Sequence, residues 1–160
     1  MHFADLIGPE AVIASLKVKT KKQLLQELAA RAARLTGLEE RYIFDTLLQR
    51  ERLGSTGLGL GVAIPHGRIK QLRDTVAVFV RAKDGIPFEA PDDEPVRLVY
   101  AMLVPEHATE QHLNMLSELA QMFGDADLRD ALLAESDPVA VHKMLTEWTP
   151  YAAAKRTAAV

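Results

Sequence analysis

The sequence has no cysteine among its 160 residues. This absence excludes disulfide frameworks, thiol nucleophiles and cysteine-ligated zinc sites, and it suits a reducing compartment. Long apolar runs are also missing, because the most apolar stretch, residues 98–105, is far too short to cross a bilayer. The first residues, Met1 to Asp5, lack the basic start and apolar core of a signal peptide. We therefore expect a cytoplasmic protein that is not integral to a membrane.

A strong excess of positive charge is absent as well. The formal net charge is −3, which argues against a general nucleic-acid-binding protein. Hydrophobic residues make up 48% and charged residues 26% of the chain, as in ordinary soluble domains, and the length fits one domain. A chain of this size buries about two-thirds of its unfolded surface, so it needs neither a disulfide nor a metal to fold.

Two amphipathic helices are predicted in the first third of the chain. Thr20 and Gln23 have the spacing of a capping box, and leucines at helical spacing follow them. This helix is expected to stop at Gly37, and residues 38–53 form the second helix. The short break between them predicts an antiparallel helical pair.

Strands and then further helices are predicted in the remainder of the chain. The β-branched and strongly apolar runs at residues 75–80 and 97–104 favour strands. Helices are expected over residues 109–123, 127–134 and 138–148. This order of elements indicates a single α/β domain over residues 1–148, with helices on both sides of its sheet. Residues 149–160 carry no apolar stripe long enough to dock, so we expect a flexible, frayed tail there.

A glycine-rich, uncharged segment separates the first helices from the strands. No charged residue occurs between Leu53 and Pro65, and this stretch holds four of the nine glycines: Gly54, Gly57, Gly59 and Gly61. Glycine at this density indicates tight turns or a close approach of another group to the backbone. Ile64 is held extended by the proline after it, and His66 and Gly67 follow. We interpret His66 as an imidazole fixed at the C-terminal edge of a strand, where α/β sheets usually bind ligands.

His112 is the second histidine of interest. It falls in the first turn of the helix predicted over residues 109–123. A helix N-terminus disfavours the imidazolium form, so His112 should stay neutral and able to donate a hydrogen bond. Paired with another histidine it could orient an anion. Taken alone, it is equally well explained as a residue on the helix surface.

The residues around His66 fit other chemistries poorly. The alternating glycines of residues 57–61 are followed by no helix and no Gly-Lys-Ser/Thr, which makes dinucleotide and P-loop sites weak hypotheses. No H-E-x-x-H occurs, and residues 54–57 do not form the G-x-S-x-G of a serine hydrolase. The remaining interpretation is that His66 itself is the nucleophile. An imidazole acting alone suits a phosphoryl relay, because it forms a phosphoramidate of high transfer potential.

Residues 50–67 read RERLGSTGLGLGVAIPHG. This segment resembles the active-site signature of the enzyme IIA family of the bacterial phosphoenolpyruvate-dependent phosphotransferase system, and more narrowly the nitrogen-regulatory branch of its fructose–mannitol class. Further similarity occurs at residues 86–92, which read IPFEAPD, and around His112 and Leu113. The resemblance extends from Leu6 to about Trp148. It implies an α/β fold with a mixed, mostly parallel five-stranded sheet between helices.

The resemblance also implies roles for individual residues. His66 matches the phosphorylated histidine, His112 the histidine that hydrogen-bonds the phosphoryl group, and Arg50 the arginine that stabilises its charge. Small polar or glycine positions beside the site are matched as binding positions by Ser55, Thr56, Gly61 and Gly67. No metal ligands and no cofactor are implied. Transfer between two imidazoles needs positioning and charge stabilisation, which arginine, histidine and backbone N–H groups can supply.

The function implied by the resemblance is regulatory. An HPr-like phosphocarrier (NPr), itself phosphorylated by an enzyme I, would supply the phosphoryl group. The phosphorylation state would then control protein targets such as potassium-transport or sensor-kinase components. One alternative is a stand-alone fructose- or mannitol-specific enzyme IIA that passes phosphate to a IIB protein during sugar uptake. Another is a binding module without phosphoryl chemistry, against which the presence of His66, His112 and Arg50 argues.

The carrier must bring its own phosphohistidine against His66, so an apolar rim around the site is expected. Leu58, Leu60 and Ile69 flank His66 in the sequence without core periodicity of their own. We expect some of them to form this rim. The alternative is that they are ordinary core residues under the sheet.

Overall fold

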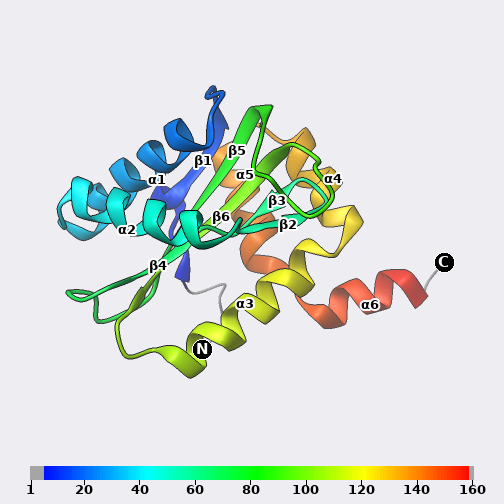
Figure 1. Cartoon of the computed structure of the whole chain (residues 1–160). Coiled ribbons are helices and arrows are strands. Elements are labelled where there is room, and N and C mark those ends of the chain that lie inside the picture. Colours follow the sequence, from blue (N-terminus) through cyan, green and yellow to red (C-terminus); the bar gives the residue numbers. More distant parts are fainter. Residues whose placement is uncertain (1–5, 159–160) are drawn as a thin grey trace.

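A mixed β-sheet forms the centre of the protein (Figure 1). The computed structural model describes residues 6–158. The first five residues, where the sequence predicts no signal peptide, and the last two residues of the predicted tail lie outside it. The strands are β1 (Val12–Leu16), β2 (Gly57–Gly59), β3 (Val62–Ala63), β4 (His66–Ile69), β5 (Val76–Ile86) and β6 (Val96–Pro105). They are ordered β1-β5-β6-β3-β2, and β4 also pairs with β6.

Within residues 6–158 the sheet has six strands, where five were expected. Strands β3 and β4 both run parallel to the same side of β6, with Val62 opposite Leu98 and His66 opposite Met102. Ile64 and Pro65 interrupt them, so the two strands count as one broken strand in a five-stranded description. Among the described residues three pairings are parallel and two antiparallel, as expected of a mixed, mostly parallel sheet.

Helices cover both faces of the sheet, as the sequence predicts (Figure 1). One face packs against α1 (Lys21–Thr36) and α2 (Glu40–Leu53). The other packs against α3 (Thr109–Phe123), α4 (Ala126–Ala134) and α5 (Pro138–Glu147). A single turn of 3-10 helix (Pro9–Ala11) precedes β1.

Alternating side chains of the central strands supply the two cores. On β5, Ala77 and Phe79 face the α3–α5 layer, whereas Val78 and Val80 face α1 and α2. Neighbouring residues of a strand point to opposite faces, so a strand covered on both sides needs a continuous apolar run. This requirement explains why β5 and β6 were recognisable in the sequence.

Local signals fix the start and end of α1 as predicted. The Thr20 hydroxyl accepts a hydrogen bond from the Gln23 backbone N–H, and the Gln23 side chain accepts one from the Thr20 N–H. Gly37 ends the helix in the left-handed conformation, with φ of 75°. The predicted capping box is therefore confirmed.

The C-terminal segment differs from the frayed tail expected. Residues Pro150–Ala158 form a helix, α6, that extends from the body of the protein (Figure 1). The Arg156 guanidinium pairs with Asp125 and, at 2.9 Å, with Asp127. Alanine has the highest helix propensity of all residues, and these ion pairs tie the helix to the start of α4.

Candidate active site

Three elements converge on a surface hollow of about 400 Å³: the last two turns of α2, strand β4 and the start of α3. It is lined by Thr46, Gln49, Arg50, Leu53, His66, Gly67, Arg68 and His112. His66 is the first residue of β4 rather than the C-terminal end of a strand, because pairing with β6 resumes after Pro65. The expected placement is wrong in that respect. The hollow nevertheless brings together His66, His112 and Arg50.

Hydrogen bonds define the state of the His66 ring. Its Nδ1 lies 2.8 Å from the carbonyl oxygen of Ile64, a group that only accepts hydrogen bonds, so Nδ1 carries the proton. The Arg50 Nε–H points at Nε2 over 3.3 Å, and the Arg50 Nη1 donates to the carbonyl of Gly54 at 2.8 Å. A neutral ring with its proton on Nδ1 has its lone pair on Nε2, which makes Nε2 the nucleophilic atom.

Burial and charge keep His66 neutral. Partial burial lowers the pKa of its imidazole, and the neighbouring Arg50 guanidinium lowers that pKa further. The hydrogen bond to Ile64 and the Glu51 carboxylate oppose this effect without cancelling it. A neutral imidazole is the form that attacks an electrophile, so the surroundings favour a nucleophile near neutral pH.

His112 packs against His66, with 4.9 Å between the ring centroids and a tilt of 56°. Burial, followed by the charges of His66, Arg68 and Arg50, lowers the pKa of His112 to about 4. The neutral state expected from the sequence therefore has burial as its main cause. The Nδ1 atom of His112 is buried and has no hydrogen-bond partner among the described residues.

The lowered pKa of His112 predicts a pH-dependent stability. An unfolded histidine takes up a proton below its ordinary pKa of about 6.5, whereas folded His112 stays neutral down to about 4, so stability should fall as the pH drops through this range. Thermal midpoints at pH 7 and pH 5 check this. In His112→Gln the drop between the two should be smaller by about 2–5 °C. Equal drops in both proteins would contradict the assignment.

The glycine after His66 is needed for packing. A Cβ atom on Gly67 would lie 2.7 Å from the Thr46 Cγ2 atom of α2. Gly67 therefore lets α2 lie close against β4. This close packing brings Arg50 of α2 within reach of His66 on β4.

The other positions that the family resemblance assigns to binding, Ser55, Thr56 and Gly61, do not line the hollow. The Ser55 hydroxyl donates to the carbonyl of Phe88, and the Thr56 hydroxyl donates to the Glu51 carboxylate. Gly61 forms the turn between β2 and β3, with φ of 77°, and its carbonyl accepts the N–H groups of residues 97 and 98. These three residues shape the loops that lead to His66.

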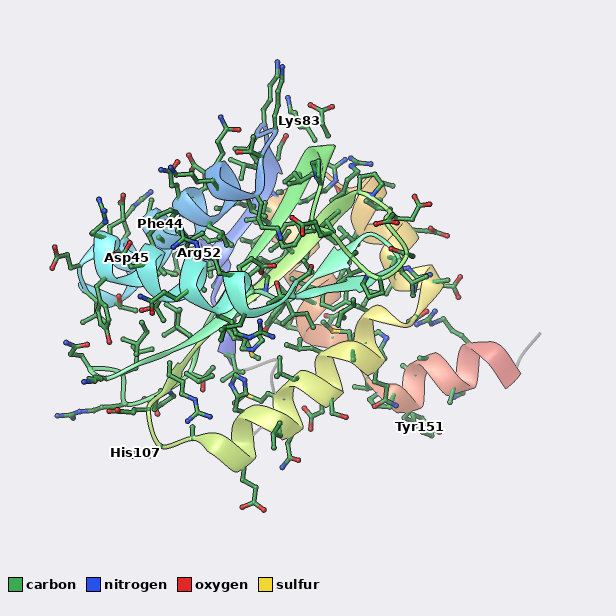
Figure 2. The ribbon with its side chains drawn as sticks, in the orientation of Figure 1. Phe44, Asp45, Arg52, Lys83, His107 and Tyr151 are labelled. Carbon is green, nitrogen blue, oxygen red and sulfur yellow. The ribbon has the colours of Figure 1, made fainter. Side chains whose placement is uncertain are left out.

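Sequence reasoning missed several lining residues. Thr46 and Leu53 recur with Arg50 at helical spacing on one face of α2, and Gln49 lies beside them. Arg68 lies two residues after His66 on β4, which places both on the same face of the strand. Both periodicities could have identified these residues once Arg50 and His66 were chosen. The histidine that precedes α3, His107, is labelled in Figure 2. It is exposed and does not line the hollow.

The expected rim is partly wrong. Ile69 is fully buried in the core between the sheet and helices α1 and α2. Leu58 and Leu60 are exposed, but neither lines the hollow. Leu53, which is 85% exposed, lines the hollow, and Leu113, which is 63% exposed, directly follows His112 on α3. We call Leu53 and Leu113 the apolar rim.

The described residues contain no group of three or more histidine or acidic side chains placed to hold a metal ion. Among residues 6–158 we also find no helix that combines the length and apolarity of a membrane span.

Comparison with known proteins places these observations in a family. Residues 5–148 match the family model described as the EIIA 2 component of the phosphoenolpyruvate-dependent sugar phosphotransferase system. A nitrogen regulatory protein of Bradyrhizobium diazoefficiens is 47% identical over 145 residues, which is 91% of this chain and 95% of the relative.

Solved structures agree with this match. The nitrogen regulatory protein IIA-Ntr of Neisseria meningitidis superposes with a TM-score of 0.85 at 37% identity, covering 89% of this chain and 98% of that one. The mannitol IIA of Escherichia coli shares the fold at 24% identity, with a TM-score of 0.74, over 86% of this chain and 97% of that one. The single α/β domain with a mixed sheet between helices is thus confirmed.

Proposed function

Because the chain belongs to the EIIA type 2 family of the phosphoenolpyruvate-dependent sugar phosphotransferase system, we propose that His66 accepts a phosphoryl group on Nε2 from an HPr-like phosphocarrier. The observation that carries the proposal is the fixed ring of His66. Its Nδ1 proton is held by the Ile64 carbonyl, its Nε2 atom faces the Arg50 Nε–H, and the His112 ring packs against it.

The transfer exchanges one nitrogen–phosphorus bond for another. The Nε2 lone pair of His66 forms the new bond to phosphorus while the carrier's nitrogen–phosphorus bond breaks, and the electron pair of that bond stays on the carrier imidazole. The carrier imidazole takes up a proton from solvent, while the phosphorylated His66 ring keeps its Nδ1 proton towards Ile64 and holds one positive charge. Arg50 then moves its N–H from Nε2 to the phosphoryl oxygens. His112, being neutral, donates an N–H to the same group. Preorganised donors of this kind stabilise charge that develops in a transition state.

The direct test uses the complete relay. The protein is incubated with phosphoenolpyruvate, an enzyme I and an HPr-like carrier, and its intact mass is then measured. A gain of one phosphoryl group that depends on all three additions is expected. No gain in mass, with a carrier that is itself fully phosphorylated, would refute the proposal.

We assign the output of the protein to regulation. The curated relative at 47% identity and the solved structure at 37% identity both carry the name of nitrogen regulatory proteins. In this proposal the unphosphorylated and phosphorylated forms bind different protein targets, such as potassium-transport or sensor-kinase components. Affinity capture with wild-type protein in the two states, compared by mass spectrometry, identifies partners that discriminate between them.

Transfer is expected to proceed without a divalent metal. Arg50, Arg68 and the neutral His112 line the hollow together with His66, and these groups can neutralise the phosphoryl oxygens in place of Mg²⁺. Purified phosphorylated carrier should therefore transfer its group at the same rate in the presence of EDTA. A loss under EDTA that a divalent ion restores would contradict this prediction.

The apolar rim is expected to contact the carrier. Leu53→Asp should raise the KM for phosphorylated carrier about fivefold or more with little change in thermal stability, because Leu53 is largely exposed and its aspartate would have to lose water in the complex. Leu60→Asp is the comparison. Val62, two residues after Leu60, pairs with Leu98, whereas His66 pairs with Met102. These partners lie four residues apart on β6, so Leu60 is more than about 13 Å along the sheet from His66. A larger effect for Leu60→Asp would restore the rim expected from the sequence.

A further inference from the structure

One carboxylate of the protein is almost completely buried. Glu51, in the last turn of α2, is 6% exposed, and it is the only buried acidic residue in the part of the chain that the structure describes. A carboxylate taken out of water is costly unless several groups compensate it. Its partners therefore indicate which parts of the protein depend on it.

Three donors from two segments satisfy the Glu51 carboxylate. The Lys21 ammonium lies 3.0 Å from Oε2, and the Thr56 backbone N–H donates to the same oxygen at 3.0 Å. The Thr56 hydroxyl donates to Oε1. Lys21 also donates to the carbonyl of Phe88 at 3.1 Å, with its ammonium over the ring of that residue. Glu51 thus links the start of α1, the end of α2 and the loop at Thr56.

A continuous series of hydrogen bonds leads from Thr56 to the reacting ring. The carbonyl of Thr56 accepts the N–H of Ile64 at 3.0 Å, and the carbonyl of Ile64 accepts the Nδ1–H of His66 at 2.8 Å. Through Thr56 and Ile64, the carboxylate is therefore connected to the hydrogen bond that fixes the proton on Nδ1. Which ring nitrogen of a histidine carries the proton is set by the hydrogen bond that the other makes.

The opposite ring nitrogen depends on the same segment. Arg50 directly precedes Glu51, and it bridges the carbonyl of Gly54 and the Nε2 atom of His66. Anchoring Glu51 at the end of α2 thus also anchors the guanidinium that faces Nε2. Both ring nitrogens of His66 thus bond to groups that are connected to Glu51: Nδ1 to the Ile64 carbonyl, and Nε2 to the Arg50 guanidinium.

We propose that Glu51 is a positioning residue for phosphoryl transfer. Through Thr56 and Ile64 it holds His66 in the Nδ1–H tautomer, with the Nε2 lone pair directed into the hollow. The inference rests on the proposed function of His66 and extends it to a residue that touches neither the phosphoryl group nor the ring.

The test is Glu51→Gln, which keeps the size of the side chain and removes its charge. Nitrogen-15 NMR of the unphosphorylated protein reads the tautomer of His66 directly. Wild-type protein should be in the Nδ1–H form, and the variant should populate both tautomers. Phosphoryl transfer to the folded variant should be slower by about tenfold or more, because small misplacements of a reacting group have large effects on rate.

Asp45→Asn is the matched control. Asp45 lies on the same helix, as labelled in Figure 2, and its side chain is 47% exposed. Its ion pair is with Arg41, one turn earlier on α2. This variant removes one carboxylate from α2 and should leave the tautomer and the transfer rate unchanged.

A second variant covers the case in which Glu51→Gln does not fold. Thr56→Val removes the hydroxyl that donates to Glu51 and keeps the backbone bond to Ile64, so a smaller shift in the same direction is expected. The inference is overturned if folded Glu51→Gln protein keeps the wild-type tautomer of His66 and transfers phosphate at a rate within twofold of wild type. If Glu51→Gln does not fold, the same result for Thr56→Val overturns it. The NMR measurement needs no phosphoryl donor, so it separates failure of this inference from failure of the proposed function.

Discussion

His66→Ala is expected to abolish phosphorylation of the protein, with a loss of about 10⁴-fold or more in the rate of transfer. The reason is that the variant lacks the atom that forms the bond to phosphorus, and no other imidazole in the hollow has the same setting. The hydrogen bond to the Ile64 carbonyl distinguishes His66 from His112, which has a more strongly lowered pKa and a buried Nδ1.

The chemistry of the adduct provides an independent check. Phosphohistidine is a phosphoramidate, so the wild-type product should be labile in acid and stable in base. His107→Ala is the control, because His107 is exposed and does not line the hollow. An acid-stable phosphoprotein, or one that still forms in His66→Ala, would refute the assignment of His66.

Replacing Arg50 is expected to have the second-largest effect. Arg50→Gln should slow phosphoryl transfer by about 10²-fold, which is typical for removal of one preorganised donor from a developing negative charge. The loss should appear chiefly in kcat, because the Arg50 Nε–H faces the Nε2 atom of His66, where the phosphoryl group is proposed to bind.

Arg52→Gln is the matched control for this experiment. Arg52 lies two residues further along α2, is exposed and is labelled in Figure 2, and it does not line the hollow. Both variants remove one positive charge from the same helix. Equal losses in the two would mean that the overall charge of this surface matters, and that Arg50 has no specific role at the phosphoryl group.

Elements with strong local signals could be predicted from the sequence. The capping box at Thr20, the stop at Gly37 and the apolar runs of β5 and β6 all determine their structure within a few residues. Strand β1 was not predicted, because Val12–Leu16 is only five residues long and becomes a strand by pairing with β5, which lies far along the chain. Short runs of this kind carry too little local information to distinguish strand from loop.

In the candidate site, too, features determined by consecutive residues could be predicted, and features that depend on packing between distant segments could not. The backbone setting of His66 and Gly67 is written in consecutive residues, so the sequence identified it directly. Arg50 and His112 reach the ring only through the packing of α2 and α3, and the sequence placed them there through family resemblance. Ser55 and Thr56 were expected beside the site through the same resemblance. Small polar residues in loops usually bond nearby backbone and side chains, and these two do so.

The neutral state of the two histidines has a consequence for the electrostatic potential outside the hollow. With both rings uncharged, Arg50 and Arg68 are the charged residues that line it, and they make its mouth electropositive. A phosphoryl group brings about two negative charges and cancels this field almost completely. The change extends into solvent by roughly one Debye length, about 8 Å at physiological ionic strength. An acidic partner would therefore be steered towards the unphosphorylated protein before any contact forms, and salt would weaken that preference by slowing its association.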